Sequence, residues 1–201
     1  MDMDNMMNEM GGAFMVVWLA GGMDSLGGAL VLAAAWMAIG GAHILPVITW
    51  GHIMTGDLSD TDAWMDNGSR LVAQVVGAIL ALMLVGSGSV DAVTEETVMW
   101  SFELWPTLGA VAAGALLWTV YDRCDAWVTA FVVFAMTAVV ANDLTGVEEA
   151  AGMLDFGGAE AMGTSLVGGG DDMVAAVMSW VMGGLWAGVG ALVATKVPDM
   201  L

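Results

Sequence analysis

Six long stretches of the sequence contain no charged residue, and they constrain the fold more than any other feature. They cover residues 10–23, 25–56, 71–90, 104–121, 126–142 and 173–195. Most are close to the roughly 20 residues that an apolar helix needs to cross a bilayer. Because 59% of the 201 residues are hydrophobic, a single soluble core could not enclose them all. The sequence therefore predicts an all-α membrane protein with several transmembrane helices.

The charged residues lie between these stretches and are mostly acidic. The chain has 22 aspartates and glutamates but only three basic residues, Arg70, Arg123 and Lys196, which gives a net charge of −19. Such a surface suits high salt, where the repulsion between carboxylates is screened. A lineage of generally acidic composition would explain the same charge. Under either explanation, a nucleic acid is an unfavourable partner.

The three basic residues also predict an orientation, because cytoplasmic loops collect lysine and arginine close to the membrane spans. We place six spans at roughly 9–23, 26–42, 70–89, 103–121, 126–142 and 173–195. A chain that starts in the cytoplasm then has all three basic residues on the cytoplasmic side, with Arg70 and Arg123 in loops. This predicts a multi-pass protein of the cell membrane with both termini in the cytoplasm.

Six spans divide into two sets of three, at residues 9–89 and 103–195, within one membrane domain of residues 1–201. Because three is odd, the second set enters the membrane from the opposite face, which defines an inverted repeat. Each set opens with an acid, Glu9 and Glu103. These acids could relay protons in an ion-coupled transporter. The predicted spans offer no second acid, lysine or histidine to accept the proton, so a structural role is favoured.

The stretch 25–56 is too long for one span, and Pro46 interrupts it. We expect a helix that ends near Gly41, an unwound segment through His43, Ile44 and Leu45, and a half-helix that begins near Pro46. Proline suits the first turn of a helix, where its missing N–H leaves no bond unmade. Unwound backbone at membrane depth must be buried in protein or line a water-filled cavity. The pattern therefore predicts a re-entrant loop beside a pore or binding site.

This segment, "IGGAHILPVITWG" at 39–51, resembles the first signature of the aquaporin and glycerol-facilitator family, which has Asn-Pro-Ala at its centre. The positions that match are Gly41, His43, Pro46, Thr49 and Gly51. Leu45 replaces the asparagine and Val47 replaces the alanine.

Other segments extend the resemblance over most of the chain. "SRLVAQVVGAILAL" at 69–82 is similar to the family's third helix, with Gln74 and Gly77 in the usual places. "ANDLTG" at 141–146 resembles the end of the fifth helix, and "SWVMGGLWAGVGAL" at 179–192 resembles the sixth.

The resemblance implies six transmembrane helices and two re-entrant half-helices around one narrow pore, in a homotetramer within the lipid bilayer. It implies that Glu9 and Glu103 each hold the adjacent loop through its backbone N–H groups, and that His43 is a structural residue that bonds the loop backbone. No catalytic chemistry and no cofactor are implied. His43 and His52 are too few and too widely spaced in the sequence to predict a metal site.

The pore residues depart from the family pattern. In the family, the asparagines of the two signatures hydrogen-bond the passing solute and an arginine narrows the outer filter, but no asparagine of this chain can head a half-helix and no arginine is free for the filter. The second signature fits in two registers, and we favour the one that places Glu160 at the filter over the one that places Met153 there. The implied pore centre consists of Leu45, Pro46, Val47, Gly157, Gly158 and Ala159. The implied outer filter consists of Ser25, Ala138 and Glu160.

The expected function is passive conduction of water or small neutral solutes, and the chain is not expected to be an enzyme. One alternative is a wider pore that passes glycerol, urea, ammonia, gases or cations, because Glu160 would make the filter negative. Another is a structural membrane protein that kept the fold and lost conduction. The bulky Leu45 and Val47 at the pore centre favour this last alternative.

Overall fold

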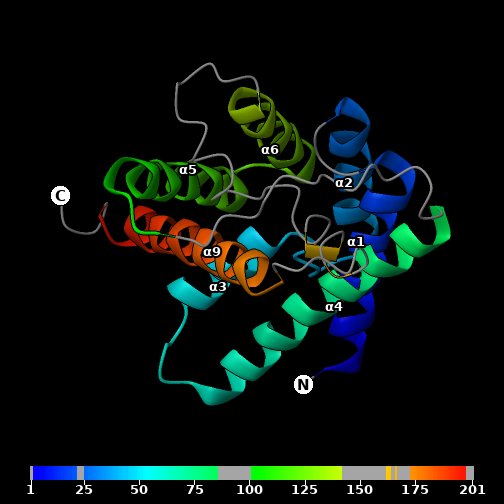
Figure 1. The fold of residues 1–201 in the computed structure, drawn as a ribbon, viewed down its shortest axis with the longest axis horizontal. Helices are drawn as coiled ribbons and strands as arrows, with labels where there is room; N and C mark the ends of the chain where they lie inside the picture. Colours follow the sequence, from blue (N-terminus) through cyan, green and yellow to red (C-terminus); the bar gives the residue numbers. More distant parts are fainter. Residues whose placement is uncertain are drawn as a thin grey trace.

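The computed structural model describes residues 2–21, 25–85, 101–141, 162–163, 166 and 173–197, and the regular structure among these residues is helical. Figure 1 shows the labelled helices. In chain order they are α1 (Met3–Ala20), α2 (Leu26–Ala38), α3 (Pro46–Thr55), α4 (Thr61–Val85), α5 (Leu104–Arg123), α6 (Ala126–Ala141) and α9 (Met173–Lys196).

Three of these helices are long and apolar enough to cross a membrane, namely α4, α5 and α9. The helices α2 and α6 are equally apolar but shorter. The first half of α1 carries several polar residues, among them Asp4 and Glu9. The composition of the helices is therefore that of a membrane protein, as predicted.

Two helices begin earlier than their apolar stretches suggest, because polar side chains cap them. Asp2 precedes α1, and its carboxylate accepts a hydrogen bond from the N–H of Asp4 at 3.0 Å. Asp60 precedes α4 and accepts from the N–H groups of Asp62 and Ala63. Capping carboxylates satisfy N–H groups that have no partner within the helix. As a result, α1 begins at Met3 and α4 at Thr61, not near residues 9 and 70.

The break expected within residues 25–56 is present. The helix α2 ends at Ala38, and α3 begins with Pro46 in its first turn after seven irregular residues, 39–45. With ten residues, α3 is the shortest of the labelled helices and far too short to cross a bilayer. A turn then leads to α4. In this turn the hydroxyl and the N–H of Ser59 donate to Asp57, and these bonds lower the pKa of the Asp57 carboxyl.

The helices of each half pack in the same pairs. In the first half α1 lies against α4 and α2, in the second half α5 lies against α9 and α6, and α2 contacts α6 between the halves. Close backbone approach accompanies the first pair in each half. A Cβ at Gly77 of α4 would overlap the carbonyl of Met10, and one at Gly114 of α5 would overlap the carbonyl of Ala187. These two glycines allow the helices to touch.

The short helix α3 lies in the interior, where it contacts α9, α4 and α5 (Figure 1). Its first six residues are all buried. The pair Gly184 and Gly188 of α9 packs directly on α3, since a Cβ at either position would collide with Trp50. The Gly-x-x-x-Gly spacing of α9 therefore serves packing within the chain.

Candidate functional site

The irregular segment before α3 contains a strained turn. Ile44 has a φ of 65°, and the N–H of Leu45 bonds to the carbonyl of His43 at 2.7 Å across it. A positive φ is unfavourable for a β-branched residue, and such strain costs about 1–3 kcal/mol. Ile44 is 1% exposed and lies against Gly12 of α1, which has no side chain to obstruct it. The surrounding contacts must therefore hold the turn in place.

Glu9 supplies the first of these contacts. Its Oε1 accepts from the N–H of His43 at 2.7 Å, and its Oε2 accepts from the N–H of Ile44 at 2.6 Å. Glu9 is fully buried, and it has the role that the resemblance implies for it. A carboxylate can satisfy two adjacent N–H groups at once, and these charged hydrogen bonds are roughly twice as strong as neutral ones.

Arg70 binds both the acid and the loop. Its Nη1 donates to Glu9 Oε1 at 2.7 Å and to the carbonyl of Gly41 at 2.9 Å, while its Nε contacts Asp66 at 3.3 Å. Arg70 is 9% exposed and lies well inside α4. The interpretation of Arg70 as a loop residue is therefore wrong. Because α4 begins early, Arg70 lies within the helix, and its side chain reaches Glu9 of α1 and Gly41 of the broken segment.

Gln74, one helical turn further along α4, continues the network. Its Nε2 donates to Glu9 Oε2 at 2.8 Å and to Thr49 Oγ1 of α3 at 3.0 Å. Thr49 Oγ1 lies 3.1 Å from His43 Nδ1. Gln74 and Thr49 are both 0% exposed. One connected set of hydrogen bonds thus joins α1, the loop, α3 and α4.

The ring of His43 does not bond the loop backbone, contrary to expectation. Besides its contact with Thr49, it stacks on the ring of His52, with centroids 4.1 Å apart and planes 4° apart. His52 Nε2 lies 3.4 Å from the hydroxyl of Tyr121, and the ring of Trp118 lies nearly perpendicular to the same imidazole. The irregular segment folds back on α3, so the two histidines meet despite their spacing. Parallel rings do not direct two nitrogens to one ion, and no metal-binding group is found among the described residues.

The residues implied for the first half of the pore centre are enclosed by apolar side chains. Leu45 is 2% exposed and Val47 is 9% exposed. Both belong to a core cluster with residues of six helices, including Leu32 of α2 and Val133 of α6. Pro46 is buried beside them. The site that carries asparagine and alanine in the family signature is therefore apolar and tightly packed in this chain.

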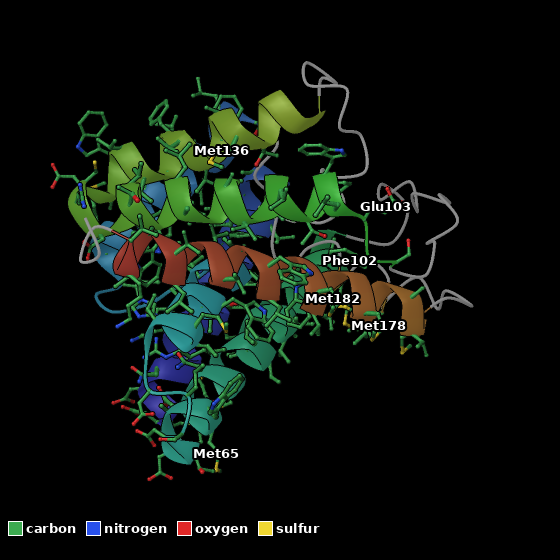
Figure 2. The ribbon with its side chains drawn as sticks, turned by 90° about the vertical axis from the view of Figure 1, so that its left-hand side faces the viewer. Met65, Phe102, Glu103, Met136, Met178 and Met182 are labelled. Atoms are coloured by element: carbon green, nitrogen blue, oxygen red, sulfur yellow. The ribbon has the colours of Figure 1, made fainter. Side chains whose placement is uncertain are left out.

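The remaining implied site residues are only partly described. Ser25 caps α2, with its Oγ accepting from the N–H of Gly28 at 3.1 Å. Glu103 is exposed at the start of α5, and its carboxylate does not cap that helix. Figure 2 shows it beside Phe102 on the side of the molecule where Met178 lies, far from Met65. Outside the described residues are Met153, Gly157, Gly158, Ala159, Glu160 and the side chain of Ala138.

The chemistry of this network is that of a structural anchor. The expectation that the spans contain no second acid is wrong, because α4 begins early enough to include Asp66, and Arg70 binds both Asp66 and Glu9. However, the direct side-chain partners of Glu9 are the guanidinium of Arg70 and the amide NH₂ group of Gln74, and both donate hydrogen bonds to it. With four donors directed at it, the carboxylate is held in place as an acceptor.

Sequence reasoning missed Arg70 and the pairing of the two histidines. The i, i+4, i+8 spacing of Asp66, Arg70 and Gln74 places all three on one face of a helix, and this signal could have identified the buried arginine.

No protein-family model matches the chain, and no curated protein matches it either.

Proposed function

We propose that the chain is a passive membrane channel of aquaporin-like architecture, which conducts water or small neutral solutes. In this proposal α1, α2, α4, α5, α6 and α9 are six spans around one pore, and α3 is the first of two re-entrant half-helices. The protein lies in the cell membrane with both termini in the cytoplasm and assembles as a homotetramer. It carries out no catalysis.

The observation that carries the proposal is the broken segment between α2 and α3. Its backbone is irregular among long apolar helices, where free N–H and C=O groups are costly, and a buried ion pair satisfies several of them. Positive φ at Ile44 adds strain that the packing must balance. Irregular, strained backbone of this kind inside a helical membrane protein is typical of a binding site or a conduction path.

Two further observations support the arrangement. The pairing of α1 with α4 and α2 recurs as the pairing of α5 with α9 and α6, as an inverted repeat requires. Large apolar side chains are exposed on the outer helices, for example Leu19 of α1, Leu80 of α4 and Leu116 of α5. Exposed apolar surface of this extent suits contact with lipid tails.

A non-conducting structural protein of the same fold is the second candidate, and one observation favours it. Leu45 and Val47 are buried among apolar side chains where a solute would need space and polar partners. A wider path for glycerol, urea, ammonia, gases or cations is the third candidate, and it depends on the second half of the pore.

Stopped-flow light scattering on proteoliposomes tests these candidates. The purified protein is reconstituted, and shrinkage in an osmotic gradient is compared with that of empty liposomes for water and for glycerol. Water rates above the control support the channel, and the ratio of water to glycerol flux reports the width of the pore. Rates equal to the control, from protein that is folded and tetrameric, would refute conduction of both solutes.

Two substitutions at the proposed pore centre distinguish a closed protein from a working apolar pore. Leu45→Asn adds a polar partner, and Val47→Ala removes bulk from the same cluster. A closed protein should gain water permeability from the pair of changes. A working pore should instead change its ratio of water to glycerol flux.

A further inference from the structure

The outward side of α2 is a single apolar stripe. The residues exposed along it recur every three or four positions, as neighbours on one face of a helix do, and they are Leu26, Leu30, Ala34 and Met37. The helix α6, which contacts α2, exposes a stripe of the same kind that consists of Trp127, Phe131 and Ala135. We call these two stripes together the α2–α6 face.

Lipid tails are the partner that the α2–α6 face fits. Neither helix contains a charged residue, although the chain has 22 acids, so the face is complementary to hydrocarbon and not to a charged surface. The face presents four residues of α2 and three of α6. A stable protein interface takes roughly 20–30 residues from each side, which is far more.

The α2–α6 face is also too short for a bilayer of ordinary thickness. Both ends of α2 are fixed, by the cap of Ser25 at one end and by the irregular segment that follows Ala38 at the other. The 13 residues of α2 rise about 20 Å, whereas the hydrocarbon core of a typical bilayer is about 30 Å thick. The 20 residues of α5 rise about 30 Å, so α5 has no such deficit.

Polar groups beyond both ends of α2 prevent lipid tails from covering more of the chain. Gly40 and Gly41 are exposed in the irregular segment, and the carbonyl of Gly41 accepts a hydrogen bond from Arg70. At the other end, Asp24 directly precedes the cap residue Ser25 in the sequence. Irregular backbone exposed to lipid is not found within the hydrocarbon region, and a charge there is costly. Water or lipid headgroups must therefore reach both ends of α2.

We propose that the α2–α6 face selects lipids with short acyl chains and thins the membrane beside it. This inference rests on the membrane location in the proposed function, but not on conduction. A hydrophobic segment shorter than the bilayer is accommodated by thinning, at a modest cost for each ångström of mismatch. Short tails lower that cost, so they should gather at the α2–α6 face and not at α5.

The test compares two lipid-facing probes in the same protein. In a Cys124→Ser background, Leu30→Cys carries a bimane probe on the α2–α6 face, and Leu116→Cys carries it on α5 as the matched control; both native side chains are exposed. The vesicles contain equal amounts of dimyristoleoyl- and dioleoylphosphatidylcholine, and either the short or the long chains are brominated to quench the probe. Brominated short chains should quench the Leu30→Cys probe at least about twofold more than brominated long chains, and the two should quench the Leu116→Cys probe equally.

The other outcomes separate this proposal from the proposed function. Equal quenching by short and long chains at both probes would overturn the preference for short tails. A Leu30→Cys probe that neither lipid quenches, beside a quenched Leu116→Cys probe, would mean that a second copy of the chain covers the face, which also overturns the proposal. Met37→Cys on the same stripe should repeat the result of Leu30→Cys. If neither lipid quenches any probe, the membrane location fails, and the proposed channel fails with it.

Discussion

The ion pair between Glu9 and Arg70 is the single contact whose loss we expect to destabilise the protein most. Their side chains are 0% and 10% exposed. Removal of one partner leaves a buried charge without compensation, which costs about 3–5 kcal/mol. Arg70→Met should therefore lower the thermal unfolding temperature in detergent sharply. The double variant with Glu9→Gln should recover part of the loss, because the two effects are coupled.

Arg123 offers the matched control, since it lies exposed at the end of α5. Arg123→Met should change the free energy of unfolding by no more than about 0.5 kcal/mol. If Arg70→Met proved as stable as Arg123→Met, the loop would not depend on the buried pair. Circular dichroism during heating measures both variants under the same conditions.

The two partners of this pair differ in how far the sequence could predict them. Glu9 stands beside an apolar stretch and has a counterpart in the family pattern, so its contact with the loop could be anticipated. Arg70 borders a charge-free stretch in the same way, but there the charge predicts the boundary of a span. Its partner lies 61 positions away in the sequence, and only the packing of α1 on α4 brings them together.

The contact between α1 and α4 depends on the absence of a side chain at Gly77. Its Cβ would overlap the backbone carbonyl of Met10, which cannot rotate away. Gly77→Ala should therefore separate the helices and cost about 1–3 kcal/mol, as overpacked cores do. Gly68→Ala on the same helix meets nothing within 4 Å and should stabilise the helix by up to about 1 kcal/mol. Thermal unfolding of the two variants should thus shift in opposite directions, and a shift in the same direction would contradict this account of the interface.

The helices themselves could be predicted better than their ends. The start of α3 follows from Pro46, because proline is tolerated in the first turn of a helix but disrupts its interior. The starts of α1 and α4 could not be predicted from apolar character, because the caps Asp2 and Asp60 lie outside the apolar stretches. The second signature, placed by the resemblance at 157–160, lies outside the described residues.

The charge of the whole chain predicts a dependence of stability on salt. With a net charge of −19, the carboxylates repel one another in the folded state. Raising NaCl from about 0.1 M to about 1 M shortens the Debye length from roughly 10 Å to roughly 3 Å, so the unfolding temperature should rise. Replacing the exposed acids Asp4 and Asp62 by asparagine should make this rise smaller. A flat salt response of the wild type would argue against adaptation to high salt.

The path of the whole chain through the membrane can be tested with its one cysteine. Cys124 is exposed directly after α5, at the opposite end of that helix from Ser101. The proposed topology places Cys124 in the cytoplasm. A membrane-impermeant maleimide should therefore label it in inverted vesicles and not in intact cells.

Two variants without the native cysteine extend this test to both sides of the membrane. Ser101→Cys in a Cys124→Ser background should label from outside intact cells, because α5 is 20 residues long and apolar enough to cross the bilayer. Ser59→Cys in the same background should label only from the inside, because the turn between α3 and α4 must share a face with Cys124 if α3 enters and leaves on one side. Labelling of Ser59→Cys and Ser101→Cys from the same side would mean that α3 and α4 do not follow the re-entrant path, and the channel architecture would fail with it.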